Sequence, residues 1–323
     1  MTATQRTEGP DGAVAVDCSQ VTRAMRRVFI QLPHVVRAQN RMGELLTHQC
    51  KGEEPEHLLI TGEAGVGKSF LLKKFREKHP PVEHSRFREI PVLYTEVPAA
   101  CSIKKLAGEM LHSMGSPFWN RGTEADRTHQ LLTLLRECRV RLVVLDEVNH
   151  LVERGKAATH YAVGDWIKQL TDKAGISFVL AGTPTARVLL LTNAQIRSRF
   201  GEDIAIEPLR LSSPGDVRTF RNTLRIFQSL LSGMDSVDFT EKDMLRKFGY
   251  ATGGRLRALV DLLVRGVEIA SESNPPSLSM LALERSFTEV LFPRAPKGRN
   301  PFNGEFNGKP LTALGEPFGP ERK

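Results

Sequence analysis

Apolar and polar residues alternate along the chain with a pattern that changes near residue 212. Before that point, short apolar runs recur between longer stretches with helical spacing, which is typical of a parallel sheet covered by helices on both faces. The runs predict five strands, at 57–61, 90–97, 141–146, 176–181 and 203–206. After that point only helical spacing remains, and residues 217–292 are expected to form a bundle of three or four helices.

Turn and cap residues mark the ends of several of these helices. Two segments with helical spacing, 21–32 and 35–46, are separated at Pro33 and predict an N-terminal arm. Ser102 and Gly115 bracket a later helix, whose apolar stripe leaves Lys104 and Lys105 outside it. Residues 213–216 and 240–243 read as the starts of two helices in the C-terminal bundle.

The first candidate for chemistry lies between a predicted strand and a predicted helix. Its sequence is Gly62-Glu63-Ala64-Gly65-Val66-Gly67-Lys68-Ser69. In this G-x-x-x-x-G-K-[ST] pattern, backbone N–H groups surround phosphates, the lysine contacts the outer phosphates and the hydroxyl binds Mg²⁺. Phe70 continues into the helix, whose N-terminal dipole favours an anion. The segment predicts an ATP site with Ser69 as a metal ligand.

A second candidate ends the apolar strand that begins at Leu142. There Asp146 and Glu147 form a carboxylate pair. Asp146 would hold the Mg²⁺ shell, and Glu147 would polarise the water that attacks the γ-phosphate. Alone, the pair fits a solvated strand end just as well, but the phosphate loop upstream favours the catalytic interpretation. Together the two motifs predict a Mg²⁺-dependent ATPase.

Composition restricts the class of protein. A chain of 323 residues that is 40% hydrophobic and 25% charged can bury a full core and a second, smaller one. No apolar stretch approaches a membrane span and no signal-peptide pattern is present, so a cytoplasmic protein without a membrane partner is expected. The four cysteines lack metal-site spacing, and no metal beyond Mg²⁺ is expected. A net charge of +8 fits a polyanionic partner and generic solubility equally well.

An α/β core followed by a helical lid is the architecture of AAA+ ATPases. The order of motifs further resembles the TniB/TnsC group of transposition ATPases, relatives of the MuB target-selection proteins. Beyond the two motifs above, the resemblance rests on Pro33 with Arg41-Met42, on residues 175–183 and on residues 197–200. It implies an AAA+ P-loop NTPase core with a parallel five-stranded sheet and a small helical lid. The expected parts are a flexible N-terminus (1–17), a helical arm (18–56), the nucleotide-binding core (57–211), the lid (212–292) and a Pro/Gly-rich tail (293–323).

The resemblance also assigns roles to individual residues. Thr183 stands where AAA+ enzymes carry the sensor of the γ-phosphate, although many of them use Asn there. Arg199 stands at the position of an arginine finger that reaches a neighbouring subunit's nucleotide, which requires an oligomer. Arg257 fits the spacing of the second sensor better than Arg255. For each arginine, an ordinary helix-surface position is the alternative.

By the same resemblance, ATP-bound subunits would assemble as a ring or helical filament on double-stranded DNA and recruit a transposase and a TniQ-like adaptor. Nothing in the chain resembles a base-reading module, so mostly phosphate contacts are expected, with Lys104, Lys105 and Arg121 as candidates. The loop 115–122 is expected either to tuck its aromatics away or to form a surface contact. The alternatives are another AAA+ ATPase of DNA metabolism, of origin or clamp-loader type, and a nucleotide-gated signalling scaffold.

The last segment, 293–323, has a composition that predicts no packed core, because it is rich in Pro and Gly. It is expected to be either a disordered extension or a docking peptide for a partner. The apolar anchors of such a peptide would be Phe302, Phe306, Leu311, Leu314 and Phe318. Either interpretation predicts that removal of the tail leaves the folded core and lid intact.

Overall fold

The computed structural model describes residues 17–51, 55–99, 101–151, 157–192, 197, 199–231 and 233–320. Nearly all of the predicted N-terminal segment, 1–17, lies outside these ranges, as does Ser198. The chain forms two compact units, one of Gln31–Glu207 and one built from the segments on either side of it. The predicted helical arm is therefore divided, because its first helix belongs to the same unit as the lid and its second to the core.

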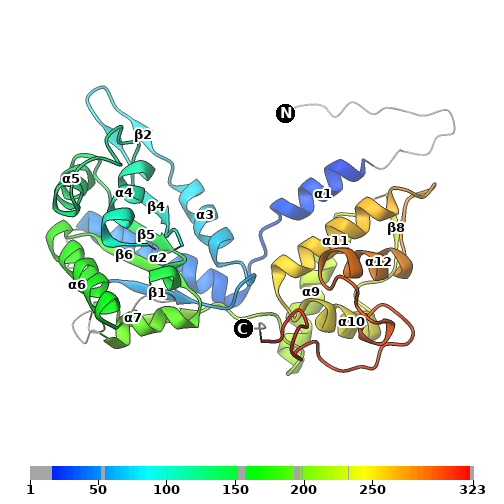
Figure 1. The fold of residues 1–323 in the computed structure, drawn as a ribbon. Helices are drawn as coiled ribbons and strands as arrows, with labels where there is room; N and C mark the ends of the chain where they lie inside the picture. The colour runs from blue at the N-terminus through cyan, green and yellow to red at the C-terminus, as the bar shows by residue number, and fades with distance from the viewer. Residues whose placement is uncertain are drawn as a thin grey trace. The chain divides into compact units, whose positions relative to one another are not determined.

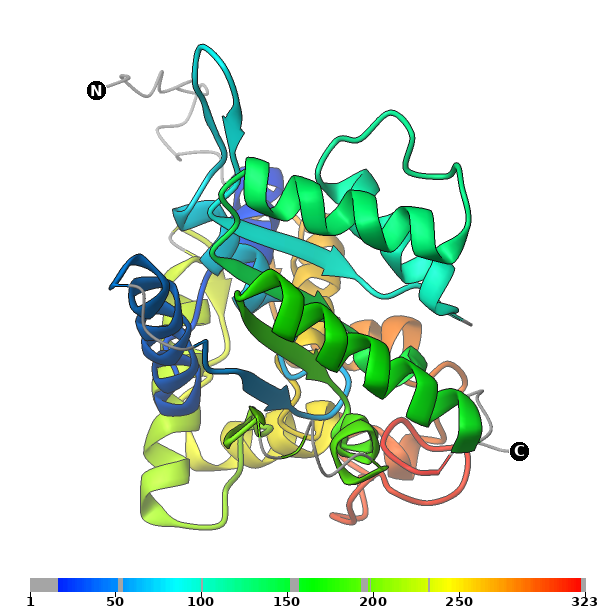
Figure 2. The ribbon, with the colours of Figure 1, turned by 90° about the vertical axis from the view of Figure 1, so that its left-hand side faces the viewer.

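The core unit contains a five-stranded parallel sheet with the order β4-β5-β6-β1-β7 (Figures 1 and 2). Its strands are β1 (Leu58–Thr61), β4 (Val92–Glu96), β5 (Leu142–Asp146), β6 (Ser177–Gly182) and β7 (Glu202–Ala205). The five predicted strands and their parallel arrangement are confirmed. β1, β5 and β6 are buried along their whole length, as expected for strands covered on both faces.

Helices cover both faces of this sheet. On one side, α4 (Ile103–Ser113), α5 (Glu124–Glu137) and α6 (Ala157–Ala174) share an apolar core with alternate residues of the strands, such as Val143 and Leu145. On the other, α2 (Pro33–Lys51) and α3 (Lys68–Lys78) contact the strands. Within the described ranges, the unit also contains the hairpin β2 (Val82–Glu83) and β3 (Arg88–Glu89), the short helices η1 (Val148–Leu151) and η2 (Pro184–Ala186), and α7 (Arg187–Thr192).

The second unit is helical, as expected. Its described helices are α1 (Cys18–Arg27), α9 (Pro214–Ser229), α10 (Lys242–Thr252), α11 (Leu256–Ala270) and α12 (Met280–Val290), joined by the short pair β8 (Asp235–Ser236) and β9 (Ser277–Leu278) and followed by η3 (Lys297–Arg299). Ser213 and Asp216 cap α9 reciprocally, which confirms that predicted start. The predicted start at 240–243 is also confirmed, because α10 begins at Lys242, but no side chain caps it: the Thr240 hydroxyl donates to Asp238 instead. No helix in the described ranges is both long and apolar enough to cross a membrane.

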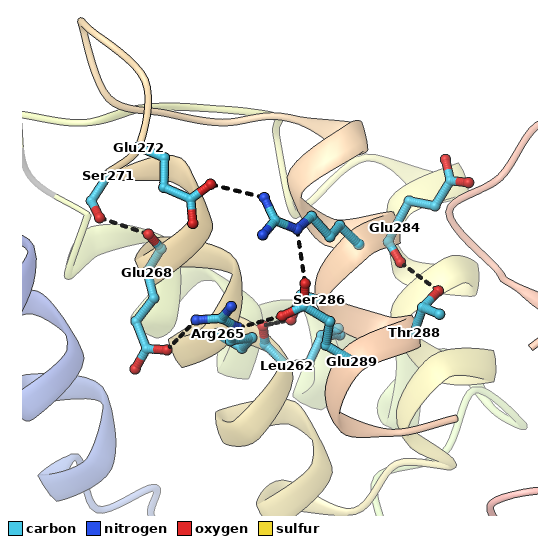
Figure 3. Close-up of polar contacts among 10 residues, drawn as sticks. Leu262, Arg265, Glu268, Ser271, Glu272, Glu284, Ser286, Thr288 and Glu289 are labelled. Carbon is cyan, nitrogen blue, oxygen red and sulfur yellow. Dashed lines mark hydrogen bonds and ion pairs between the residues drawn. The ribbon is translucent and has the colours of Figure 1, made fainter. Parts of the chain in front are cut away.

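Charged side chains join α11 to α12 (Figure 3). The Arg265 guanidinium pairs with Glu289 at 2.6 Å and with Glu268 at 3.0 Å. Arg285 pairs with Glu289 and Glu272, each at 2.8 Å. Arginine charge on this face of the lid is therefore already matched by carboxylates within the chain.

The C-terminal tail packs on the lid, contrary to the expectation from its composition. Phe302 is 3% exposed, and its ring meets Phe248 of α10 edge to face at 5.5 Å between centroids. Leu311 is buried, and the Arg299 guanidinium folds the segment on itself by binding both carboxylate oxygens of Glu316. The tail cannot bury these side chains by itself, but they pack against the apolar surface of the lid helices.

Removal of the Phe302 ring is accordingly expected to destabilise the lid. A Phe302→Ala variant should lose about 3–5 kcal/mol, because it leaves a cavity against α10. Chemical denaturation followed by circular dichroism measures the loss, and Leu314→Ala is a suitable control because Leu314 is 60% exposed. Equal denaturation midpoints for the two variants would contradict the packing of the tail on the lid.

Candidate functional site

The phosphate loop joins β1 to α3 at the carboxyl edge of the sheet. Gly65 and Gly67 have φ of 79° and 104°, in the left-handed region that side chains disfavour. A Cβ at Gly62 would lie 2.4 Å from the carbonyl oxygen of Ile206, so only glycine lets the loop pass this close to the chain beyond β7. The loop thus has the backbone shape that the sequence pattern requires.

Lys68 lies at the first turn of α3 with its side chain inside the loop. It is buried, and its Nζ donates to the carbonyl oxygens of Gly62 at 2.8 Å and of Glu63 at 3.0 Å. Burial lowers the pKa of the Lys68 ammonium, while the charges of Glu147 and Asp146 act in the opposite direction. The lysine is therefore electrostatically coupled to both carboxylates that the sequence singled out.

Asp146 is fully buried at the end of β5, with a donor on each carboxylate oxygen. The Tyr94 hydroxyl donates to Oδ2 and the backbone N–H of Glu147 to Oδ1, both at 2.9 Å. Burial and the adjacent Asp146 raise the pKa of Tyr94, so the phenol keeps its proton and stays a donor. Glu147 has φ of 56°, so the chain turns sharply as it leaves the strand. Sequence reasoning missed Tyr94, because no local pattern shows that its strand pairs with β5.

Thr183 follows β6 at the same edge. Its N–H donates to the Asn149 side-chain oxygen at 3.2 Å, and its hydroxyl lies 2.6 Å from that of Thr185. The N–H of Gly62 donates to the Gly182 carbonyl at 3.1 Å, which joins the start of the phosphate loop to the residue before Thr183. The carboxyl ends of β5, β6 and β1 thus bring together the predicted sensor, the carboxylate pair and the loop.

These groups fit a nucleotide with Mg²⁺. The loop backbone and the start of α3 have the shape that phosphates require, and Ser69 and Asp146 both carry hard oxygen atoms at this edge, of the kind that Mg²⁺ prefers. Within the described ranges no cluster of three or more His, Cys, Asp or Glu side chains forms a metal cage. Mg²⁺ needs none, because it usually binds one or two carboxylates together with substrate phosphates.

Arg199 lies at the opposite edge of the sheet from the phosphate loop. It precedes β7, whose first residue pairs with the first residue of β1, whereas the phosphate loop follows the last residue of β1. Its Nη1 pairs with Asp172 at 2.6 Å. Burial, together with the Arg199 charge, lowers the pKa of His57, just before β1, to about 4. The arginine is therefore remote from the phosphate loop of its own chain.

The two candidate second-sensor arginines differ in accessibility. The Arg257 side chain is 81% exposed and lies 3.8 Å from Asp261. The Arg255 guanidinium instead stacks over the Phe318 ring of the tail, 4.5 Å from its centroid. Both belong to the unit that contains the lid, so the assignment of a sensor role stays a prediction.

The three candidate DNA contacts gather around one buried arginine that sequence reasoning missed. Lys104, Lys105 and Arg121 are exposed. Arg127 on α5 is 9% exposed, and its guanidinium donates to the carbonyl oxygens of Lys104 and Arg121, both at 3.1 Å. It thereby holds the start of α4 against the loop 115–122 and places the predicted cations on one surface.

Comparisons with known proteins agree with this fold. One relative, the ORC1-type DNA replication protein 1 of Sulfurisphaera tokodaii, is 23% identical over 80% of this chain and 63% of its own length. This chain thus spans about three fifths of that relative. Among solved structures, Cdc6p from Pyrobaculum aerophilum matches with a TM-score of 0.61 at 19% identity, over 87% of this chain and 73% of the other.

A further structure, the Aeropyrum pernix ORC1 protein in complex with DNA, matches with a TM-score of 0.58 at 16% identity, over 84% of this chain and 69% of the other. At such identities these likenesses show the fold, which is that of AAA+ ATPases. The family model of the bacterial TniB protein matches residues 20–208, which is more than half of the chain and includes the phosphate loop, the carboxylate pair, Thr183 and Arg199. The chain belongs to the TniB family.

Proposed function

We propose that this chain is an ATP-dependent, DNA-binding AAA+ regulator of transposition. One observation carries the proposal: in a TniB-family chain, Lys68 and the carboxylate pair lie at one edge of the sheet and Arg199 lies at the other. A subunit built in this way can bind a nucleotide at one edge and complete a neighbour's site with the other. That arrangement supports nucleotide-dependent assembly.

In the proposed hydrolysis, each residue has one task. Lys68 leaves its loop carbonyls to contact the outer phosphates, and Glu147 orients and polarises the attacking water. Mg²⁺ held by Ser69 and Asp146 would neutralise phosphate charge. The Tyr94 hydroxyl holds the Asp146 carboxylate in place by a hydrogen bond. Thr183, whose N–H binds Asn149 at the end of β6, would sense whether the γ-phosphate is present.

Assembled subunits would form a ring or helical filament on double-stranded DNA, mark the target and recruit a transposase and a TniQ-like adaptor. Support comes from the family match and from the exposed cations of the Lys104, Lys105 and Arg121 surface. The test is retention of the element's transposase on immobilised duplex DNA that carries this protein. Retention with ATP, and its loss with ADP, is the expected result; equal retention without this protein would refute the recruiting role.

The cation surface makes a separate prediction about salt. Replacing Lys104, Lys105 and Arg121 by Gln should weaken binding to all duplex sequences alike and flatten the log–log salt dependence by roughly one unit per lost contact. The affinity should be measured by fluorescence anisotropy over a range of NaCl concentrations. Arg265→Gln combined with Arg285→Gln is the control, because those charges are already matched by glutamates. A triple variant with the parental slope would place the DNA track elsewhere.

The two alternatives are less well supported. Likeness to ORC1-type replication proteins favours an origin-type role, but at 23% identity or less it supports the fold more than the task. A signalling scaffold would use the tail as its main interaction element, yet Phe302 and Leu311 are buried within the chain.

A further inference from the structure

Phe118 differs from every other phenylalanine of this chain. All 16 phenylalanines lie in the described ranges, and Phe118 is the one among them that is exposed, at 51% of its surface. A single exposed apolar side chain is ordinary on a protein surface. What sets this one apart is how firmly the loop around it is held.

The loop 115–122 is anchored on both sides of Phe118. Before it, buried Ser116 accepts hydrogen bonds from the N–H of Phe118 at 3.3 Å and from the Gln130 side chain at 3.1 Å. After it, Trp119 packs against the apolar core, with its ring 5.0 Å from that of His112. One aromatic is thus the anchor and the other projects into solvent.

The buried Arg127 also holds the loop, through hydrogen bonds to its backbone. Besides the carbonyl oxygens of Lys104 and Arg121, its guanidinium binds the carbonyl oxygen of Asn120. Gly108 on α4 makes room for it, because a Cβ there would lie 2.8 Å from the Arg127 Nη1. A loop fixed in this way presents Phe118 in one position and loses little conformational entropy on binding.

One cation lies against the exposed ring, and two more lie on the element that Arg127 ties to the loop. The Arg121 guanidinium lies 5.3 Å from the centre of the Phe118 ring, and Lys104 and Lys105 occupy the adjoining turn of α4. Nucleic acid has charged phosphates on the outside and flat bases inside. Cations beside an exposed aromatic ring can bind the phosphates while the ring stacks on a base. A rigid apolar side chain among phosphate-binding cations is the arrangement by which proteins separate a base step.

We propose that Phe118 inserts between bases of the bound DNA, so that the protein prefers duplex with an unstacked or mismatched step. This inference rests on the proposed DNA function and names the form of DNA. Lys104, Lys105 and Arg121 neutralise phosphates, while the ring stacks on a base whatever its identity. Separating a step costs less where pairing is already broken, and a mismatch therefore favours insertion.

The test uses full-length protein with a non-hydrolysable ATP analogue and a short duplex that carries 2-aminopurine, whose fluorescence rises on unstacking. The parent protein should raise the fluorescence and bind a mismatched duplex about tenfold more tightly than the matched one. Phe118→Ala should lose both effects while keeping the salt dependence of matched binding. Phe118→Trp should retain both effects. Leu281→Ala, which removes an apolar side chain that is 73% exposed in the lid, is the control.

Three outcomes would overturn the inference. The first is equal affinity of the parent protein for matched and mismatched duplexes, which would contradict base insertion but not the proposed DNA function. The second is loss of ATP-dependent self-association by Phe118→Ala in the absence of DNA, which would make the ring a contact between copies. The third is failure of the parent protein to bind any duplex, which would remove the proposed DNA function as well.

Discussion

An Arg199→Ala variant is expected to bind ATP with parental affinity and to lose about 10³-fold or more in turnover, the scale found for arginine fingers supplied in trans. The reason is geometric. Arg199 precedes β7 at the edge of the sheet opposite the phosphate loop, so it cannot serve the nucleotide of its own chain. In one subunit its charge is matched by Asp172, and at a subunit interface it would meet a neighbour's γ-phosphate.

Steady-state ATPase assays and nucleotide titrations measure the two halves of this prediction. Arg197→Ala is a matched control, because Arg197 is an exposed arginine two residues away. Mixing Arg199→Ala with Lys68→Ala subunits should restore part of the activity, since a mixed interface has an intact loop on one side and an intact finger on the other. Full activity of Arg199→Ala alone, or a loss confined to Arg197→Ala, would remove Arg199 from the mechanism.

The second large effect concerns the division of labour between Lys68 and Glu147. Lys68→Ala should abolish nucleotide binding, because it removes the ammonium buried inside the loop. Glu147→Gln should keep ATP bound and lose about 10²–10⁴-fold in hydrolysis, the usual contribution of a positioned base. The trapped nucleotide should then hold subunits in the assembled state.

Single-turnover assays with radiolabelled ATP separate binding from hydrolysis in both variants. Glu63→Gln provides a control, because Glu63 is an exposed carboxylate of the same loop and is not assigned to water activation. Parental hydrolysis by Glu147→Gln would show that another group acts as the base.

The sheet and the loop could be predicted because their signals are local. A phosphate loop needs a short strand, glycines and a helix start within a dozen or so residues, and Asp146 follows directly on an apolar strand. Tyr94 could not be found in this way, because its bond to Asp146 depends on the pairing of β4 with β5, which brings together residues 52 apart.

The packing of the tail and the role of the buried Arg127 could not be predicted for a related reason. Composition measures what a segment can bury by itself, whereas Phe302 of the tail is buried against Phe248 of α10. Likewise, the sequence shows Arg127 only as a charged residue of a helix, and its burial depends on contacts with the backbone of the loop 115–122. In the same way, no local pattern places α1 with α11 rather than with the core, because their contact joins opposite ends of the sequence.

The most direct test of the central claim is electron microscopy of the Glu147→Gln protein with duplex DNA. With ATP, rings or helical filaments on the DNA are predicted, and ADP or the added Lys68→Ala change should abolish them. The same grids with Arg199→Ala report whether the finger also contributes to assembly. Monomeric protein in the presence of both ATP and DNA would contradict the account.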